Sequence, residues 1–399
     1  MRIKLLVISF FAFLLLSCSK EDSASTSIPE NQVLTEQIAG VPAEENKISE
    51  STLKTLNWLR HMQMSNGLLE STENSNFVSL YDNSLAALIF ISNGEYGKAE
   101  RIFDFFNTRI EVELLNGTGG FYQFRNKNGE NGSRTWIGDN AWLLIALHNY
   151  RKITGNEEYD TLIVALENWL RSLQDDDGGL YGGHNADGSK IHKITEGIIT
   201  TYIAVEGYDD FHKNLLNYLK EQRWDANEKI IVAWPENPSY NNALDLHSLG
   251  YQIFNDFPAS SLSNADRYLT KQIATVSGEA VNGYCFDQDK DVVWLEGTSQ
   301  MAMAYRHANM DHAADRLLEE IEKTFIASTL FPYSQGVPYA SNHGSTFGSS
   351  DLWDHADLTP AVSSCTWYLF ARLGFDPFDV LRKKEVLAED KFWTVESAL

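Results

Sequence analysis

Residues 138–147 read GDNAWLLIAL, an acid and an amide followed at once by an apolar run long enough for a helix. The same layout, one acid heading an apolar run, occurs six times in the 399-residue chain. The acids are Asp82, Asp139, Glu196, Asp245, Glu296 and Asp357, at spacings of 57, 57, 49, 51 and 61 residues. A recurrence of this length is typical of a repeated structural unit. The repeat is therefore the basis on which we predict the fold.

A second, amphipathic pattern precedes each apolar run. In the first copy, Leu53, Leu56, Leu59 and Met62 lie near helical spacing, with Lys and Arg between them. The other copies begin near Glu95, Asn156, Asp209, Ser263 and Met310. A helix that is apolar all round is buried, whereas one with a charged face lies at the surface. The alternation predicts an all-α fold, an (α/α)6 toroid with an inner and an outer ring of six helices.

The connections between these helices differ in length. Short turns lead from each inner helix to the next outer one, and longer segments rich in glycine and aromatic residues lead back. Short hairpins make neighbouring helices antiparallel, so all inner helices point the same way. The six acids are then expected on the rim of one cavity. The Gly-rich segments should lie over that rim and carry function, and some of them should form short strands.

The N-terminus has the pattern of a secretory signal, a basic start followed by an apolar run that ends in Ser17 and Cys18. LLSC resembles the lipobox of bacterial lipoproteins, in which the cysteine is lipidated. We predict a signal peptide at 1–17, a lipidated Cys18 with a flexible tether at 18–46, the toroid at 47–375 and a C-terminal tail at 376–399, packed on or following the toroid. The resemblance implies a membrane anchor in the bacterial cell envelope, at the outer membrane, where exposure on the cell surface is one option.

Charge and cysteine content exclude several function classes. A formal net charge of −23 argues against nucleic acid as a partner. Cys285 and Cys365 have no metal-ligand spacing, so we expect buried thiols rather than a disulfide framework. The stretch DQDKD at 287–291 invites a calcium interpretation, but the helix-loop-helix motif would need Gly where Val292 stands and Glu where Thr298 stands. No metal or cofactor is predicted.

Six helical hairpins with acids at the inner-helix N-termini resemble the six-hairpin glycosidase fold, over essentially the whole mature domain. A local motif, W-x-x-D-x-A-W at Trp136, Asp139, Ala141 and Trp142, stands one hairpin after Asp82. This arrangement is similar to that of unsaturated glucuronyl hydrolases and rhamnogalacturonyl hydrolases. The motifs that tie those families to an unsaturated uronide are not evident here. The resemblance implies two aspartates that work together on a sugar.

Paired carboxylates suit glycoside cleavage, because one protonates the leaving oxygen and the other activates water. Inverting enzymes hold the pair roughly 6.5 to 9.5 Å apart, and adjacent helices pack about 8 to 10 Å apart. We therefore expect an inverting glycoside hydrolase with Asp139 and Asp82 as the leading acid and base. Glu296 is the next catalytic candidate. The structural alternative for all the acids is helix capping, which Asp favours.

Aromatic rings over a carboxylate-lined cleft suit the apolar faces of sugars. The expected substrate contacts are Tyr81, Asn83, Trp136, Asn140, Tyr181, His184, Glu196, Trp234, Trp294 and Trp353. Arg134, His184 and His192 are candidates for binding a carboxylate-bearing or sulfated sugar. Packing is the alternative for several of these aromatic residues. Trp142, Tyr202 and Trp367 lie within inner helices and are expected in the core.

Two other functions stay open, because a fold does not fix a function. A polysaccharide lyase or sugar epimerase on the same fold would need a Tyr or His base, with Tyr81, Tyr181, His184 and His192 as candidates. A non-catalytic glycan-binding or polysaccharide-assembly lipoprotein would keep the toroid without turnover.

Overall fold

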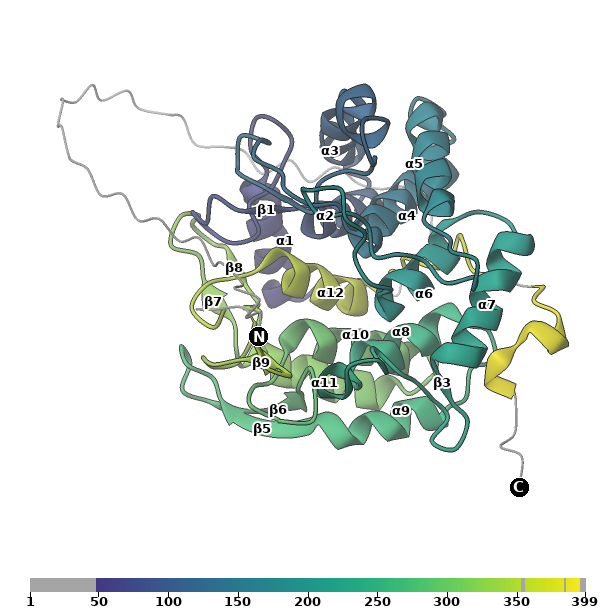
Figure 1. Cartoon of the computed structure of the whole chain (residues 1–399). Helices are drawn as coiled ribbons and strands as arrows, with labels where there is room; N and C mark the ends of the chain where they lie inside the picture. The colour runs from purple at the N-terminus through teal and green to yellow at the C-terminus, as the bar shows by residue number, and fades with distance from the viewer. Residues whose placement is uncertain (1–47, 353–355, 384, 395–399) are drawn as a thin grey trace, which may run out of the picture. The chain divides into compact units, whose positions relative to one another are not determined.

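The computed structural model describes residues 48–352, 356–383 and 385–394. Cys18 and Trp353 therefore lie outside the described residues. Six inner helices follow one another around a ring, and α12 closes it by packing on both α10 and α2 (Figure 1). They are α2 (Leu80–Ser92), α4 (Ile137–Thr154), α6 (Thr195–Ala204), α8 (Asp245–Ile253), α10 (Leu295–His307) and α12 (Val362–Leu373).

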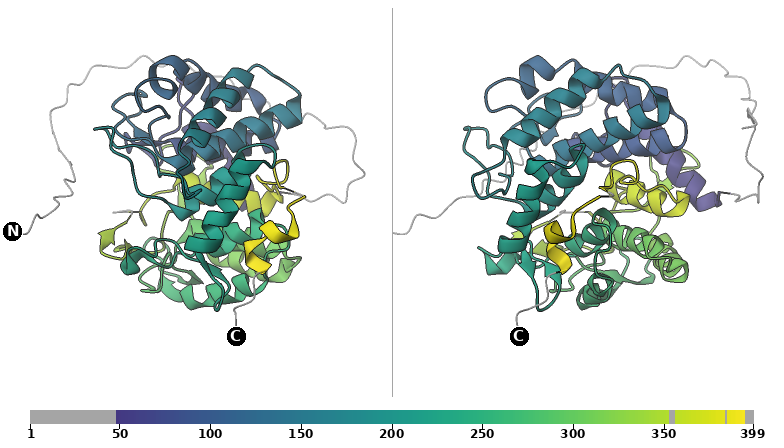
Figure 2. Two further views of the ribbon diagram at one scale, coloured as in Figure 1. Left: turned by 45° about the vertical axis from the view of Figure 1, so that its right-hand side comes forward. Right: turned by 90° about the vertical axis from the view of Figure 1, so that its right-hand side faces the viewer.

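Amphipathic helices form the outer layer at five of the six positions. They are α1 (Glu50–Met62), α3 (Tyr96–Asn107), α5 (Asp160–Ser172), α7 (Asp210–Gln222) and α11 (Asp311–Glu322). The two layers differ in burial as their patterns predict: every residue of α4 from Ile137 to Tyr150 is buried, whereas α11 buries only Ala314, Leu318 and Ile321. Figure 2 shows the early hairpins on one side of the ring and the later ones on the other.

The fifth outer position differs from the prediction. A helix was expected over 263–276, but α9 (Ser260–Asn264) is short and runs into the 3-10 helix η3 (Ala265–Tyr268). Strand β5 (Leu269–Ile273) follows and pairs antiparallel with β6 (Ala280–Tyr284). Because β-branched residues such as Thr270 and Ile273 favour extended backbone, residues 269–273 follow the two-residue period of a strand, and the helix prediction is wrong for this segment.

The predicted short strands are confirmed in the long connections. Three hairpins are built from strands of two residues each, and both strands of a hairpin belong to the same connection. They are β3 (Trp224–Asp225) with β4 (Ile230–Ile231), β7 (Ile326–Ala327) with β8 (Gln335–Gly336), and β9 (Thr346–Phe347) with β10 (Ser350–Asp351). A fourth pair, β1 (Val78–Ser79) with β2 (Phe124–Arg125), joins the connections of the first two repeats. The connections also contain the π-helix η1 (Ile110–Leu114) and the 3-10 helix η2 (Pro238–Tyr240).

The tail after α12 packs against the C-terminal ends of the inner helices, where the short turns lie. It contains the 3-10 helices η4 (Ala388–Asp390) and η5 (Phe392–Thr394). Phe378 and Trp393 are buried, and the Trp393 ring lies 4.9 Å from that of Phe254. The Lys383 ammonium donates to the carbonyl of Val205 at 2.6 Å, at the end of α6.

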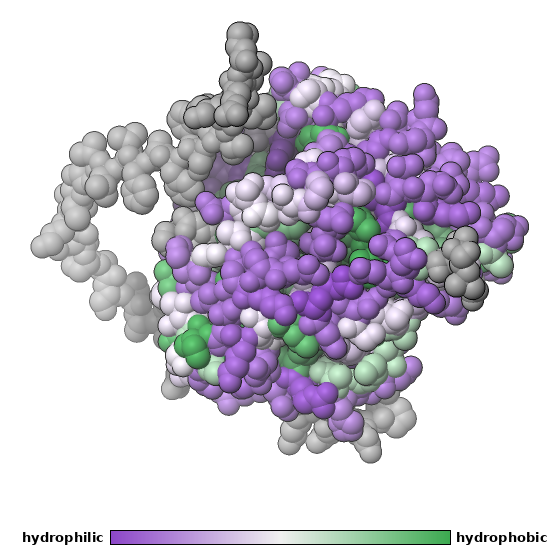
Figure 3. Space-filling model, turned by 60° about the horizontal axis from the view of Figure 1, so that its bottom comes forward, coloured by the Kyte–Doolittle hydropathy of each residue, from purple (hydrophilic) through white to green (hydrophobic). Residues whose placement is uncertain are grey.

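The surface is mainly hydrophilic where it can be seen. On the face drawn in Figure 3, hydrophilic residues predominate and apolar residues form small separate groups. Among the described residues, no helix combines the length and the apolar character that crossing a membrane requires.

Candidate active site at the inner-helix N-termini

Five of the six acids lie in the first turn of an inner helix, as predicted: Asp82, Asp139, Glu196, Asp245 and Glu296. Four of them are nearly enclosed, with exposed fractions of 2% for Asp82, 7% for Asp139, 9% for Asp245 and 6% for Glu296. Capping explains little of this, because none of the five is an N-cap residue. The carboxylates instead form one enclosed cluster.

Asp357 is not part of the cluster, which corrects the prediction for the sixth repeat. Helix α12 has Ala361 as its N-cap, so Asp357 lies in the preceding connection. Its Oδ2 accepts a hydrogen bond from the Thr275 hydroxyl at 2.5 Å. Pro360 disfavours helical backbone at the residue before it, which moves the start of the helix past the acid.

Asp139 is hydrogen-bonded across to the neighbouring hairpin. Its Oδ2 accepts from the backbone N–H of Tyr81 at 3.4 Å, and its Oδ1 accepts from the Gln123 amide at 3.4 Å. The Arg134 Nε in turn donates to Gln123 Oε1 at 2.6 Å. On the neighbouring inner helix α2, Asp82 Oδ2 accepts a hydrogen bond from the Tyr339 hydroxyl at 3.3 Å. Side chains from several connections thus orient the two carboxylates.

Tyr81 links the cluster to the far side of the ring. Its hydroxyl donates to Glu296 Oε1 at 2.6 Å and accepts from the Trp367 indole N–H at 2.7 Å. Its ring packs edge-on against Trp142 at 5.7 Å. Trp142 and Trp367 are buried core residues, as predicted. Tyr81, expected as a substrate contact, is placed where it positions Glu296.

Burial raises the pKa of every carboxyl in the cluster, and repulsion between the carboxyls raises it further for all of them except Glu196. Burial, then repulsion from Glu196 and Asp82, raises the pKa of Asp139 well above its usual range. Burial raises the pKa of Asp82 and of Glu296 to about 7 each. Burial, then repulsion from Glu196, raises the pKa of Asp245 to about 7, and burial also raises the pKa of Glu196. Protonated carboxylic acids are therefore present in this cluster at neutral pH.

These raised pKa values predict a pH-dependent effect on stability. The pKa of Asp245 rises from 3.8 to about 7 on folding, so the unfolded chain loses this proton first and stability falls as pH rises through that window. An asparagine side chain cannot ionise, so Asp245→Asn should raise the melting temperature at pH 8 and do so much less at pH 4.5. Thermal unfolding at both values checks this, with Asp210→Asn at an exposed first-turn position of α7 as control. An equal change at both pH values would contradict it.

The amides next to the acids have a structural role, which corrects their assignment as substrate contacts. Asn83 and Asn140 have no exposed surface. The Asn83 side chain accepts from Leu69 N–H and donates to Leu69 C=O, and Asn140 does the same with Phe121. Thr298 in α10 and Cys365 in α12 fasten their connections in a similar way, through Tyr284 and Val337. Each fastens the connection that precedes its inner helix.

Several predicted rim residues lie together in the connections of the second to fourth repeats. The Arg134 guanidinium lies over the Trp136 ring at 4.7 Å, and His192 stacks on Trp234 at 4.0 Å. The backbone N–H of His184 donates to the hydroxyl of Thr135, next to Arg134, at 3.0 Å. Arg134, Trp136, His184 and Trp234 are half-buried and His192 is exposed.

Two predicted aromatic contacts are placed elsewhere. Trp294 is only 4% exposed and packs on Phe286 at 4.8 Å, so its ring belongs to the loop core rather than to an open sugar platform. The Tyr181 hydroxyl donates to Asp175 Oδ2 at 2.9 Å within its own connection, and the Lys190 ammonium lies 3.9 Å from its ring centroid.

Sequence reasoning missed Gln123 and Tyr339, which contact Asp139 and Asp82. Tyr339 is separated from Asp82 by 257 residues, and no local pattern marks it. The one sequence feature that could have indicated Tyr339 is its position in a long connection rich in aromatic residues. Many other residues share that feature.

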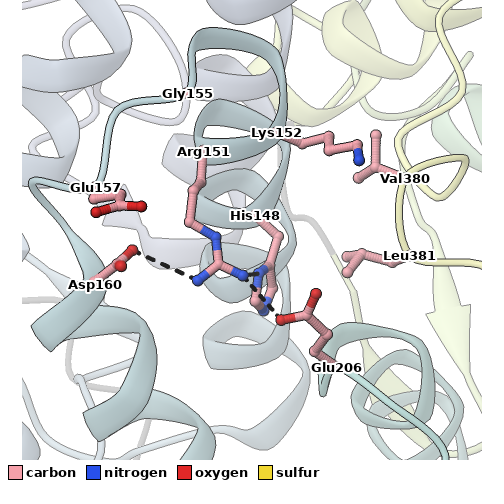
Figure 4. A pocket seen from close by; sticks show the side chains of 9 residues that line it. All are labelled: His148, Arg151, Lys152, Gly155, Glu157, Asp160, Glu206, Val380 and Leu381. Carbon is pink, nitrogen blue, oxygen red and sulfur yellow. Dashed lines mark hydrogen bonds and ion pairs between the residues drawn. The ribbon is translucent and has the colours of Figure 1, made fainter.

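A partly open pocket of about 320 Å³ lies at the opposite end of the inner helices (Figure 4). Arg151 lies at its centre and pairs with Glu206 at 2.9 Å and with Asp160 at 3.5 Å. Val380 and Leu381 of the tail line it as well. It shares no residue with the carboxylate cluster, and its charged groups largely neutralise one another.

No family model matches the chain, and no curated protein matches it significantly by sequence. Solved structures do match its fold. A glycosidase in complex with glucose matches with a TM-score of 0.56 at 13% identity, covering 84% of this chain and 99% of that one. A D-mannose isomerase gives 0.58 at 12% identity, covering 86% and 99%. A sugar epimerase from a ruminal bacterium gives 0.55 at 13% identity, covering 82% and 98%. The predicted six-hairpin glycosidase-like toroid is thus confirmed as the fold.

Proposed function

We propose that this protein is a glycoside hydrolase that acts on a poly- or oligosaccharide. The observation that carries the proposal is the enclosed cluster of five carboxyl groups with raised pKa values. Cleavage of a glycoside needs a carboxylic acid that keeps its proton at neutral pH beside a carboxylate that has lost one. The sugar-acting proteins that share the fold support a carbohydrate substrate by analogy.

Asp139 is assigned as the general acid and Asp82 as the base. Repulsion from Glu196 and Asp82 favours the protonated form of Asp139. Burial raises the pKa of Asp82 as well, but only to about 7, because hydrogen bonds from Ser71 and Tyr339 favour its ionised form. Asp139 gives its proton to the glycosidic oxygen as the C–O bond breaks, while water adds to the anomeric carbon and passes a proton to Asp82.

The proposed outcome is inversion at the anomeric carbon. Asp82 and Asp139 stand on adjacent inner helices, α2 and α4. Helix axes pack about 8 to 10 Å apart, which leaves room for a water molecule between the sugar and the base. Glu296, held by Tyr81, is the third catalytic candidate and the alternative base.

A lyase or epimerase mechanism is less well supported by the geometry. Its tyrosine base would have to lose a proton, yet the Tyr81 hydroxyl donates to Glu296. Burial and the nearby Glu296 carboxylate raise the pKa of Tyr81 well above its usual range. His184 and His192, the other candidate bases, lie in the connection before α6 and not on the inner helices.

The full-length protein should be tested by a reducing-end assay against neutral and acidic polysaccharides and their lyase-generated oligosaccharides. Release of new reducing ends from one substrate class supports hydrolysis, and proton NMR of the first product identifies its anomer. Ultraviolet absorbance of unsaturated products would indicate a lyase instead. Binding without any product would indicate a glycan-binding protein and would contradict the proposal.

The cellular location remains a prediction from the sequence. Lipidation at Cys18 would anchor the chain in the bacterial cell envelope, where glycans are accessible. Such an anchor would hold the enzyme at the surface on which its substrate arrives.

A further inference from the structure

The connection before α12 extends well beyond its own repeat. Close to the ring, the Tyr339 carbonyl accepts from Leu295 N–H at 3.0 Å, at the start of α10. Further along, the hydroxyls of Ser349 and Ser350 each lie 3.0 Å from the Tyr240 hydroxyl. Tyr240 belongs to the connection of the fourth repeat. The sixth connection therefore passes over the fifth repeat and reaches the fourth.

The acidic stretch DQDKD fastens this crossing. The Thr346 hydroxyl donates to Asp289 Oδ2 at 2.7 Å, and the Thr346 N–H donates to Asp291 Oδ2 at 2.7 Å. The Gly348 N–H donates to Asp287 Oδ2 at 3.4 Å. The three carboxylates thus hold hairpin β9–β10 against the fifth connection.

Aromatic packing makes the crossing a wall beside the carboxylate cluster. The Phe347 ring lies 4.9 Å from Tyr240 and 4.8 Å from Phe286. Phe286 packs on Trp294, the N-cap residue of α10, which carries Glu296 in its first turn. The wall therefore stands on the side of α8 and α10.

The rim from the second to the fourth repeat, which meets the wall where Trp234 packs on Tyr240 at 5.5 Å, has a different character. Trp136 and Trp234 are half-buried and His192 is exposed, so these rings face solvent at least in part. The interior of a polysaccharide must enter on one side of the cleaved bond and leave on the other. A wall on one side of nearly enclosed carboxylates leaves room for a chain end only.

We infer that hairpin β9–β10 closes the site on the side of α8 and α10, so that the protein binds one terminal sugar of a glycan. The remainder of the chain leaves across the rim formed by Trp136, His192 and Trp234. The inference rests on the proposed function and adds to it the mode of action, removal of sugars from a chain end.

The test uses an oligosaccharide of the active class in three forms: unmodified, reduced to the alditol, and capped by a benzylidene group on its non-reducing terminal sugar. Turnover and calorimetric binding are both measured on the full-length protein, with Asp139→Asn for the binding arm. We expect one of the two modifications to reduce both turnover and affinity at least about tenfold, and the other to have little effect. Tolerance of both modifications, or a ladder of internal products, overturns the inference.

A shortened variant ties the result to the hairpin. Replacement of residues 346–351 by Gly-Gly should allow the blocked substrate to bind and should produce internal cleavage. Tyr333→Ser, at an 85% exposed position earlier in the same connection, is the control and should behave as the parent. If the shortened variant fails to fold, the end-blocking comparison on the parent decides alone. Binding specific to one end without turnover would contradict only the proposed hydrolysis, and absence of both binding and turnover would overturn both proposals.

Discussion

Asp139→Asn is expected to lower kcat by about 10²- to 10⁴-fold, the range typical of losing a general acid or base. Asn has the same shape, and its single amide oxygen can accept from one of the two partners of Asp139, the Tyr81 N–H or the Gln123 amide, which Asp139 contacts through different oxygens. It has no proton to give to a leaving oxygen. Affinity for the substrate should therefore change little while turnover is lost, and calorimetric binding beside initial rates measures the two effects separately.

Asp357→Asn is the matched control for this variant. Asp357 heads the sixth repeat in the sequence, but the structure places it outside the carboxylate cluster, bonded to Thr275. Its replacement by Asn should leave kcat near the parental value. Loss of activity in Asp357→Asn, or near-normal activity in Asp139→Asn together with an inactive Glu296→Gln, would move the acid from Asp139 to another carboxyl.

The pH profile gives a second readout of the same assignment. Repulsion from Glu196 is the largest contribution after burial to the raised pKa of Asp139. Glu196→Gln removes that repulsion, so the pKa of Asp139 should fall and the active, protonated form should be lost at lower pH. The alkaline limb of kcat/KM should accordingly move toward lower pH in this variant.

Much of this site follows from sequence because the repeat fixes it. An acid at the start of each apolar run must lie at one end of a ring once all inner helices run in parallel. Asp357 is the exception, because Pro360 lies three residues later and the helix begins only after it. Asn83 and Asn140 were assigned to the substrate because a polar residue in an apolar helix indicates function or a structural hydrogen bond equally well. Only the positions of Leu69 and Phe121 decide between the two.

Contacts between distant repeats could not be predicted. Tyr81 meets Glu296 across 215 residues of sequence, and hairpin β9–β10 meets Tyr240 across more than 100. Periodicity gives the order of the helices around the ring but not the path of a long connection across it. The DQDKD stretch illustrates the limit, since three alternating acids are compatible with ion binding or with hydrogen bonds to a passing hairpin.

Phe378→Ala is expected to destabilise the protein by about 3 to 5 kcal/mol, the usual range for removing a buried aromatic ring. Phe378 belongs to the tail, has no exposed surface, and packs on Trp142 with ring centroids 5.3 Å apart. The Asn149 amide donates to the preceding Pro377 carbonyl at 2.9 Å, which holds the backbone in place. The surrounding backbone is therefore poorly able to collapse into the vacated space.

The same substitution should reach the active site through a short chain of rings. Trp142 packs edge-on against Tyr81, whose hydroxyl holds Glu296, so a cavity at Phe378 loosens the packing behind the carboxylates. Urea unfolding followed by circular dichroism measures the loss of stability, and Leu387→Ala, at a 49% exposed position of the same tail, should cost little. A loss of unfolding free energy for Phe378→Ala no larger than that for Leu387→Ala would mean that the tail contributes little to the stability of the toroid. A large loss would instead mean that the tail is part of its core and supports the cluster from the opposite end of the ring.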